Sequence, residues 1–216
     1  MKLHQRILPV FVISTFSLPS AAESIFFEDP YGAKNYMTVS AFLGTRISED
    51  VAHKSTGEVA DFSAALTQAV ALGWTYDRHS EGELLFSNSK PTLSMSNSTT
   101  SAPDIDVYIQ YLHFGGRVLF PTRTAFSSSF GLGIGATYFN PEGNDYGSEF
   151  AFSGNITGGI RYQLTEEFAL RGDLRVYGTL LNSESSLFCG NQTCYLDVDG
   201  DVYVQGELMA GLEFKF

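Results

Sequence analysis

The sequence is poor in charged residues and, beyond its N-terminal region, in long apolar runs. Only 17% of its 216 residues are charged whereas 44% are hydrophobic, which excludes a disordered chain because there is ample apolar surface to bury. Acidic residues outnumber Lys and Arg by 24 to 13, and the resulting net charge of −11 excludes nucleic acid as a partner. After the N-terminal region, no segment approaches the roughly 18 to 20 consecutive apolar residues that a membrane helix requires.

The N-terminal region has the pattern of a secretory signal. Lys2 and Arg6 precede an apolar run over residues 7–16, and the small residues Ser20 to Ala22 follow it. The run is too short to cross a bilayer as a helix, so a cleaved signal is favoured over a signal anchor. The sequence therefore predicts an exported protein, with a signal peptide at 1–22 and a single mature domain at 23–216.

Cysteine is equally scarce, with Cys189 and Cys194 as the only two. An exported chain meets an oxidising compartment, so we expect these two residues to form a disulfide. A redox-active or metal-binding pair is disfavoured because the spacing is not CxxC and no histidine is nearby. Closing so short a loop is expected to add only about 2 kcal/mol to the stability and to shape the loop.

What the chain has in abundance is alternation of apolar and polar residues. The last segment, Val202 to Phe216, places Leu208, Leu212, Phe214 and Phe216 on one face and charged residues on the other. Seven earlier segments alternate in the same way: 36–47, 62–76, 83–87, 105–120, 126–138, 150–163 and 168–180. Segments of about ten residues with this period predict antiparallel strands, each with one apolar face.

One of these segments changes phase. Ile105 to Tyr111 place their apolar side chains on one parity, whereas Leu112 to Phe120 place theirs on the other. With Ile105, Val107, Ile109 and Tyr111 on the outer face, a bulge near Tyr111 to Gly116 is expected to restore the phase. The same bulge is expected to turn His113 and Arg117 inward.

Connector lengths and aromatic positions separate a membrane barrel from a soluble sheet, which also alternates. Short connectors (77–82, 121–123 and 164–167) alternate with long ones (48–61, 88–104, 140–149 and 182–201). Aromatic residues gather near both ends of the predicted strands, as at the two interfaces of a bilayer. They are expected near the short connectors at Trp74, Tyr76, Phe120, Phe126, Tyr162, Phe168, Phe214 and Phe216, and near the long ones at Phe62, Tyr138, Phe150 and Phe152.

The signal peptide, the eight alternating segments and the terminal Leu212, Phe214 and Phe216 together resemble the small eight-stranded outer-membrane β-barrel family of Gram-negative bacteria. The resemblance implies an all-β, antiparallel, up-and-down transmembrane barrel in the outer membrane, with short periplasmic turns and long outer loops. It also implies that the terminal aromatic strand is read by the outer-membrane insertion machinery. An even strand count closes the sheet and leaves no unpaired edge in lipid, and we expect a monomer.

The inward faces carry a nearly balanced set of charges. Six basic and five acidic residues are expected there: Arg46, Glu83, Asp106, Arg117, Arg161, Arg171, Asp173, Arg175, Glu207, Glu213 and Lys215. An eight-stranded barrel is just wide enough for side chains to fill it, and unpaired buried charge is costly, so a plugged interior of ion pairs is favoured. A narrow polar conduit is the alternative, because Gly131, Gly133 and Gly135 leave room along one wall.

The expected outer loops are acidic, which suits contact with outer-membrane lipid and with lipopolysaccharide bridged by divalent cations. The run Asp197, Asp199 and Asp201 lacks the distant bidentate glutamate of a calcium loop, so we expect neither a metal site nor a cofactor.

An enzyme is disfavoured, although some barrels of this kind modify lipid A. His79 and Ser80 are expected in a periplasmic turn, His53 and Ser55 offer only a loose match to the palmitoyltransferase type, and the His-x-Ser-Asn arrangement of the deacylase type is missing. The expected role is structural or surface-interacting. The alternatives are a passive small-solute channel, a lipid A-modifying enzyme and a soluble periplasmic binder.

Overall fold

The computed structural model describes residues 36–49, 51–52, 59–77, 79–95, 105–142, 147–181, 187–190, 193–196 and 202–216. The predicted signal peptide, 1–22, lies outside this range. The described strands are β1 (Met37–Ser48), β2 (Val51–Ala52), β3 (Val59–Phe62), β4 (Ala65–Thr75), β5 (Ser80–Ser89), β6 (Thr92–Met95), β7 (Ile105–Pro121), β8 (Phe126–Pro141), β9 (Glu149–Gln163), β10 (Phe168–Leu180), β11 (Leu187–Gly190), β12 (Thr193–Leu196) and β13 (Val202–Lys215). Within the described residues, no helix is long and apolar enough to cross a membrane.

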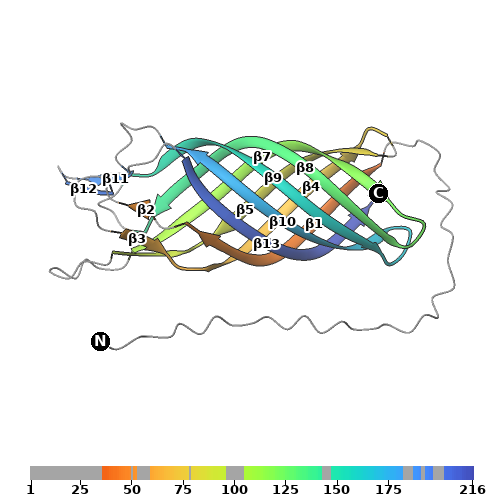
Figure 1. Ribbon diagram of the computed structural model, residues 1–216, viewed down its shortest axis with the longest axis horizontal. Helices are drawn as coiled ribbons and strands as arrows, with labels where there is room; N and C mark the ends of the chain where they lie inside the picture. Colours follow the sequence, from red (N-terminus) through yellow and green to blue (C-terminus); the bar gives the residue numbers. More distant parts are fainter. Residues whose placement is uncertain are drawn as a thin grey trace, which may run out of the picture.

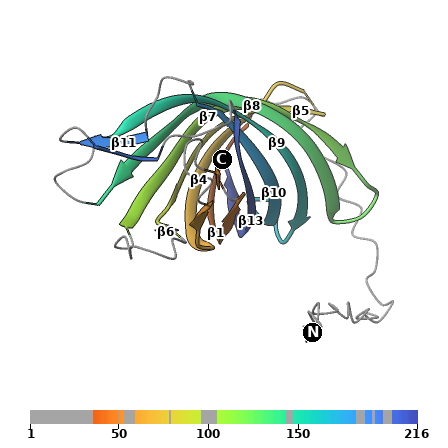
Figure 2. The ribbon, with the colours of Figure 1, turned by 60° about the vertical axis from the view of Figure 1, so that its left-hand side comes forward.

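Eight strands form a closed antiparallel barrel. Around the ring they follow chain order, β1-β4-β5-β7-β8-β9-β10-β13, and β13 pairs back with β1. Figures 1 and 2 show these strands crossing the molecule obliquely and curving around a common interior. The predicted up-and-down barrel is therefore confirmed, and closure gives every barrel strand two partners.

The two ends of the barrel differ. The turns at 76–77, 122–125 and 164–167 lie at one end of the barrel, which we call the short-turn end. The opposite ends of the strands, such as β1 at Ser48 and β8 at Pro141, define the long-loop end. The strands β2, β3, β11 and β12 lie at the long-loop end, on the left of Figure 1. Phe216 lies at the short-turn end, beside the start of β1. The Met37 amide donates to the Phe216 carbonyl at 3.0 Å, and the Phe216 amide donates to the Met37 carbonyl at 2.9 Å.

His79 and Ser80 lie at a turn of the short-turn end. The carboxylate of Asp77 accepts a hydrogen bond from the His79 amide at 2.7 Å, which lowers the pKa of Asp77, and the Tyr76 amide donates to the Ser80 carbonyl at 2.9 Å. These bonds close the turn, where the sequence predicted the pair to lie.

The exterior of the barrel is apolar. Leu132, Ile134 and Leu212 are 58, 62 and 56% exposed, where a soluble sheet would bury them against a second layer. Aromatic rings pair near the short-turn end (Trp74 with Tyr76 and Phe114, Phe126 with Tyr162, Phe168 with Phe214) and near the long-loop end (Tyr138 with Phe150). An apolar band between two aromatic rims matches a bilayer with two interfaces.

The prediction of a bulge in β7 is wrong. Its pairing with β5 and β8 continues without an inserted residue, and its odd-numbered side chains point inward along the whole strand. Val107, Ile109 and Tyr111 are therefore buried inside the barrel, each with none of its surface exposed, rather than facing lipid. His113 and Arg117 do point inward, as expected, but because the alternation is unbroken.

Two predicted strand boundaries also change. The segment 62–76 divides into β3 and β4, and the short segment 83–87 extends to the full β5. The reason is that β3 pairs with β6, which pairs with the outer end of β7, so these residues extend the wall beyond the barrel strands. Phe62, predicted at the outer aromatic rim, instead lies 5.6 Å from the ring of Tyr203 and is 6% exposed.

Glycines in β8 allow side chains inside the barrel, such as His113, to pack directly against the backbone of this strand. A substitution at one of these glycines tests how tightly they pack. A Cβ at Gly135 would lie 2.0 Å from the Leu112 carbonyl oxygen, so Gly135→Ala must displace backbone and is expected to cost about 1–3 kcal/mol. Gly158→Ala is the matched control, because nothing lies within 4 Å of its Cβ position. Urea unfolding in lipid vesicles, followed by Trp74 fluorescence, measures both; equal stabilities would contradict this packing.

Candidate functional site in the barrel interior

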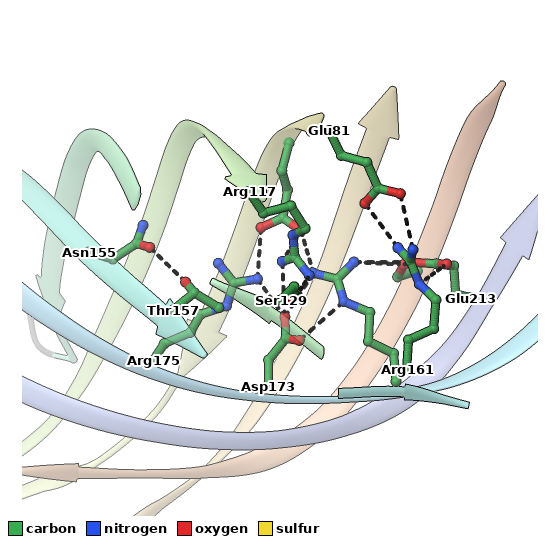
Figure 3. A network of polar contacts seen from close by, with 12 residues as sticks. Glu81, Arg117, Ser129, Asn155, Thr157, Arg161, Asp173, Arg175 and Glu213 are labelled. Carbon is green, nitrogen blue, oxygen red and sulfur yellow. Dashed lines mark hydrogen bonds and ion pairs between the residues drawn. The ribbon is translucent and has the colours of Figure 1, made fainter. Parts of the chain in front are cut away.

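Opposed charges fill the interior in three levels, beginning at the short-turn end. Arg161 on β9 donates to both carboxylate oxygens of Glu81 on β5, at 3.0 and 2.9 Å, and to Glu213 on β13 at 3.0 Å (Figure 3). Bidentate pairing of this kind fixes the planar guanidinium in one orientation. Glu213 also accepts a bond from Arg171 of the next level at 3.3 Å, so the two levels are continuous.

The middle level gathers two carboxylates among three guanidinium groups. Glu83 accepts bonds from Arg117 at 2.6 Å, from Arg175 at 2.7 Å and from Arg171. Asp173 accepts bonds from the same three arginines, at 3.3, 2.7 and 2.8 Å respectively. These groups come from β5, β7 and β10, so the level ties opposite walls together (Figure 3). Because each charge has several partners, burial of the whole set is tolerated.

The third level combines an ion pair with aromatic rings. Arg46 donates to Glu207 at 3.1 Å and to Ser87 at 2.5 Å, and Ser87 donates to Glu207 at 2.8 Å. The Tyr177 hydroxyl donates to the other carboxylate oxygen of Glu207. The Arg46 guanidinium also lies 4.7 Å from the ring centroid of Tyr111, within the range of a cation–π contact.

Aromatic and aliphatic side chains close the interior beyond the third level. The rings of Tyr111 and Tyr177 stack 4.1 Å apart, and the Tyr111 hydroxyl donates to Gln205 at 2.6 Å. Toward the long-loop end follows a set that we call the apolar plug, no member of which is more than 8% exposed: Phe62, Leu93, Ile105, Val107, Ile109, Phe139, Leu181 and Tyr203. The plug fills this part of the barrel with buried apolar side chains.

His113 lies against the aromatic stack. Its Nε2 is 2.8 Å from the hydroxyl of Ser153, and its Nδ1 bonds the amide of Asn155. A void of about 10 Å³ beside it, lined in part by Gly115 and Gly133, has room for about one water molecule. His113 is only 2% exposed and Ser153 is fully buried, so their contact lies inside the barrel.

Most of the residues predicted for the lumen charge network come together in these levels. They are Arg46, Glu83, Arg117, Arg161, Arg171, Asp173, Arg175, Glu207 and Glu213. With Glu81 included, these levels hold five arginines and five carboxylates, so their formal charges balance.

Of the other two predicted members, Asp106 lies elsewhere, whereas Lys215 keeps the inward parity of Glu213. The side chain of Asp106 is 39% exposed and pairs with Lys90 at the long-loop end, at 3.1 Å. Its predicted place in the lumen charge network is therefore wrong. The reason is that β7 extends beyond the charged levels at this end, so that Asp106 contacts solvent and not an arginine. The Lys215 ammonium lies at the short-turn end, 3.9 Å from the ring centroid of Tyr36.

Glu81 was missed because the sequence pattern assigned it to a turn ending at Gly82. In the structure β5 begins at Ser80, and Glu81 then shares the inward parity of Glu83. Parity alone would have identified it once the strand was extended by two residues. Of the two tyrosines of the third level, Tyr177 shares the inward parity of Arg175, whereas Tyr111 was assigned to the outer face because an aromatic ring suits either side.

Other predictions fall on the boundary of the described residues. The backbones of β11 and β12 place Cys189 directly opposite Cys194, but the side chains lie outside the described set and the disulfide stays a prediction. Residues 53–58, 143–146 and 197–201, which hold His53, Ser55 and several loop acids, also lie outside it.

The sequence matches no protein-family model and no curated protein, but the barrel matches solved structures. The crystal structure of Neisserial surface protein A matches with a TM-score of 0.55 at 15% identity, over 84% of this chain and 97% of that one. The outer membrane protein OprG from Pseudomonas aeruginosa matches with a TM-score of 0.52 at 14% identity, over 86% and 97%. The chain has the fold of the small outer-membrane β-barrels. At these identities the likeness establishes the fold, and the role of this β-barrel rests on its own interior and surface.

Proposed function

We propose that the protein is an integral outer-membrane barrel with a closed lumen, and that it acts through its outer surface in a structural or surface-interaction role. The observation that carries the proposal is the filled interior, in which three charged levels and the apolar plug follow one another along the barrel. A passive channel needs a continuous polar path, and the plug interrupts any such path.

The exterior supports the membrane part of the proposal. In water, an apolar band of this extent would drive aggregation, whereas hydrocarbon accepts it. No backbone edge of the barrel is left for lipid to solvate. Together with the shared fold, these features support the outer membrane of a Gram-negative bacterium as the location, with the short-turn end facing the periplasm and the long-loop end facing outward.

The terminal strand supports the proposed assembly route. β13 ends at Lys215 and Phe216 follows it, with Phe214 and Leu212 on the same lipid-facing side, and the Phe214 and Phe216 rings lie 6.0 Å apart. An exposed aromatic terminus of this kind suits recognition by the outer-membrane insertion machinery before the strand pairs with β1. Closure within one chain supports a monomer.

The long-loop end offers polar groups for surface interaction. Lys90 pairs with Glu142 at 2.7 Å as well as with Asp106, and the two carboxylates raise the pKa of Lys90. Two acids around one base leave this cluster negative. Such a surface suits lipopolysaccharide bridged by divalent cations, and these lipids are the partners we propose.

A non-enzymatic role is part of the proposal. His113 and Ser153 form the kind of pair that hydrolases use, but both side chains are sealed inside the barrel. An acyl chain in the membrane has no route to them. The proposed function therefore needs neither a catalytic residue nor a cofactor.

Conductance of the purified protein tests the closed lumen. In planar bilayers the barrel is expected to give no steady ion current, because the apolar plug and the charged levels each block the path. A channel-forming porin measured in the same bilayers is the positive control, and heat-modifiable gel mobility verifies that the barrel is folded. A steady current through the folded barrel would overturn the proposal in favour of a channel.

A further inference from the structure

The lipid-facing wall carries a groove that the closed lumen does not require. Its volume is about 840 Å³, within the roughly 300–1,000 Å³ of small-molecule sites. Two rows of outward side chains line it. Each row runs across neighbouring strands through paired residues, and the two rows are two residues apart along each strand. One row is apolar throughout: Leu170, Leu212, Ala41, Val70 and Phe86. The other is half polar: Ala210, Leu43, Gln68, Asn88 and Gln110.

The groove descends across the apolar band. At its polar end, Gln110 on β7 is followed on the same face by Tyr108 and Asp106, toward the long-loop end. At its apolar end, Leu170 on β10 is preceded on the same face by Phe168, at the short-turn end. The strands run obliquely (Figure 1), and the groove therefore leads from the outer interface into the hydrocarbon.

Three carboxamide side chains lie side by side on the lipid-facing wall, where apolar side chains are expected. Gln68, Asn88 and Gln110 lie directly opposite one another on β4, β5 and β7. Within the described residues none of the three side chains is hydrogen-bonded, and the Asn88 Oδ1 is buried without a partner. Hydrocarbon cannot satisfy these groups, so leaving them bare in the membrane is unfavourable.

We propose that this groove binds an acyl chain of an outer-leaflet lipid, with the amide that joins the chain to its polar head held by the three carboxamides. A carboxamide offers both a donor and an acceptor, and an amide linkage matches both, whereas an ester linkage offers acceptors only. The apolar remainder of the groove fits the chain. A phosphate is not the recognised group, because Lys90 above the groove is already paired with two carboxylates.

The inference rests on the proposed insertion into the membrane, and the test separates the two. The purified full-length barrel in detergent, checked for folding by heat-modifiable mobility, is mixed with ceramide and with diacylglycerol of equal chain length. Native mass spectrometry then measures the lipid retained. Ceramide is expected to be retained about tenfold more than diacylglycerol, the effect of roughly one hydrogen bond. A chain that does not fold speaks against membrane insertion, whereas a folded barrel without preference speaks against the amide site.

Variants locate the site. Gln68→Leu with Asn88→Leu keeps the wall apolar and is expected to bring the ratio of ceramide to diacylglycerol near one. Ala210→Leu fills the groove, and retention of both lipids is expected to fall about tenfold. Ala136→Leu is the matched control, because this alanine faces outward on β8 away from the groove. If Ala210→Leu retains as much ceramide as Ala136→Leu, the groove is not where lipid binds and the inference is overturned.

Discussion

Replacing Glu83 with leucine is expected to lower the free energy of unfolding by about 3–5 kcal/mol. The carboxylate accepts bonds from Arg117, Arg171 and Arg175 at once, and it is only 8% exposed. Without it, Asp173 alone remains at this level to balance three guanidinium groups. Urea unfolding in lipid vesicles, followed through Trp74 fluorescence, measures the loss.

Two further variants distinguish the cost of leaving buried charges unpaired from the cost of replacing any glutamate with leucine. Glu142→Leu removes an acid from the exposed cluster at Lys90 and is expected to change stability by no more than about 1 kcal/mol. Glu83→Leu combined with Arg175→Leu removes one charge of each sign and is expected to recover part of the loss. A cost for Glu83→Leu as small as that for Glu142→Leu would mean that the middle level does not hold the barrel together.

Replacing Tyr111 with alanine is expected to destabilise the barrel by about 3–5 kcal/mol and yet leave it unable to conduct ions. The substitution removes a fully buried ring from the stack on Tyr177 and leaves Gln205 without the hydroxyl that it bonds. The lumen should still be closed, because the apolar plug lies on one side of Tyr111 and the middle charged level on the other. Urea unfolding and planar-bilayer current measure the two effects.

Tyr108→Ala is the matched control for this experiment. Tyr108 lies on the same strand, but its ring faces outward, 5.1 Å from the Lys90 ammonium. Its loss is expected to cost about 1 kcal/mol, the value of an exposed cation–π contact. A steady current through folded Tyr111→Ala protein would contradict a lumen closed at separate levels.

Much of the barrel could be predicted from the sequence because strand alternation is a local signal. Leu132, Ile134 and Leu212 could be assigned to the exterior from their own neighbours, since every second residue of a strand faces the same side. The buried arginines could be found in the same way, because a charged residue opposite an apolar face has only the interior left. Neither inference needs knowledge of what lies across the barrel.

The prediction failed where an apolar side chain faces inward. Val107 and Ile109 have the hydrophobicity of lipid-facing residues, so the pattern in 105–120 was interpreted as a change of phase with a bulge. In the structure they belong to the apolar plug, together with Phe139 from β8 and Tyr203 from β13. Hydrophobicity cannot distinguish burial against lipid from burial against protein, and only the partners across the lumen decide between them.

The sequence by itself determined the number of barrel strands, the outward side of most of them, the alternation of short and long connections and the near balance of interior charges. Each of these follows from residues close together in the chain. Only the tertiary structure decided that the lumen is closed by apolar side chains as well as by ions, that Asp106 belongs to the outer rim, and that three carboxamides from separate strands share one register on the lipid-facing wall. These arrangements depend on which side chains meet across a closed sheet, and closure brings together residues that no local pattern relates.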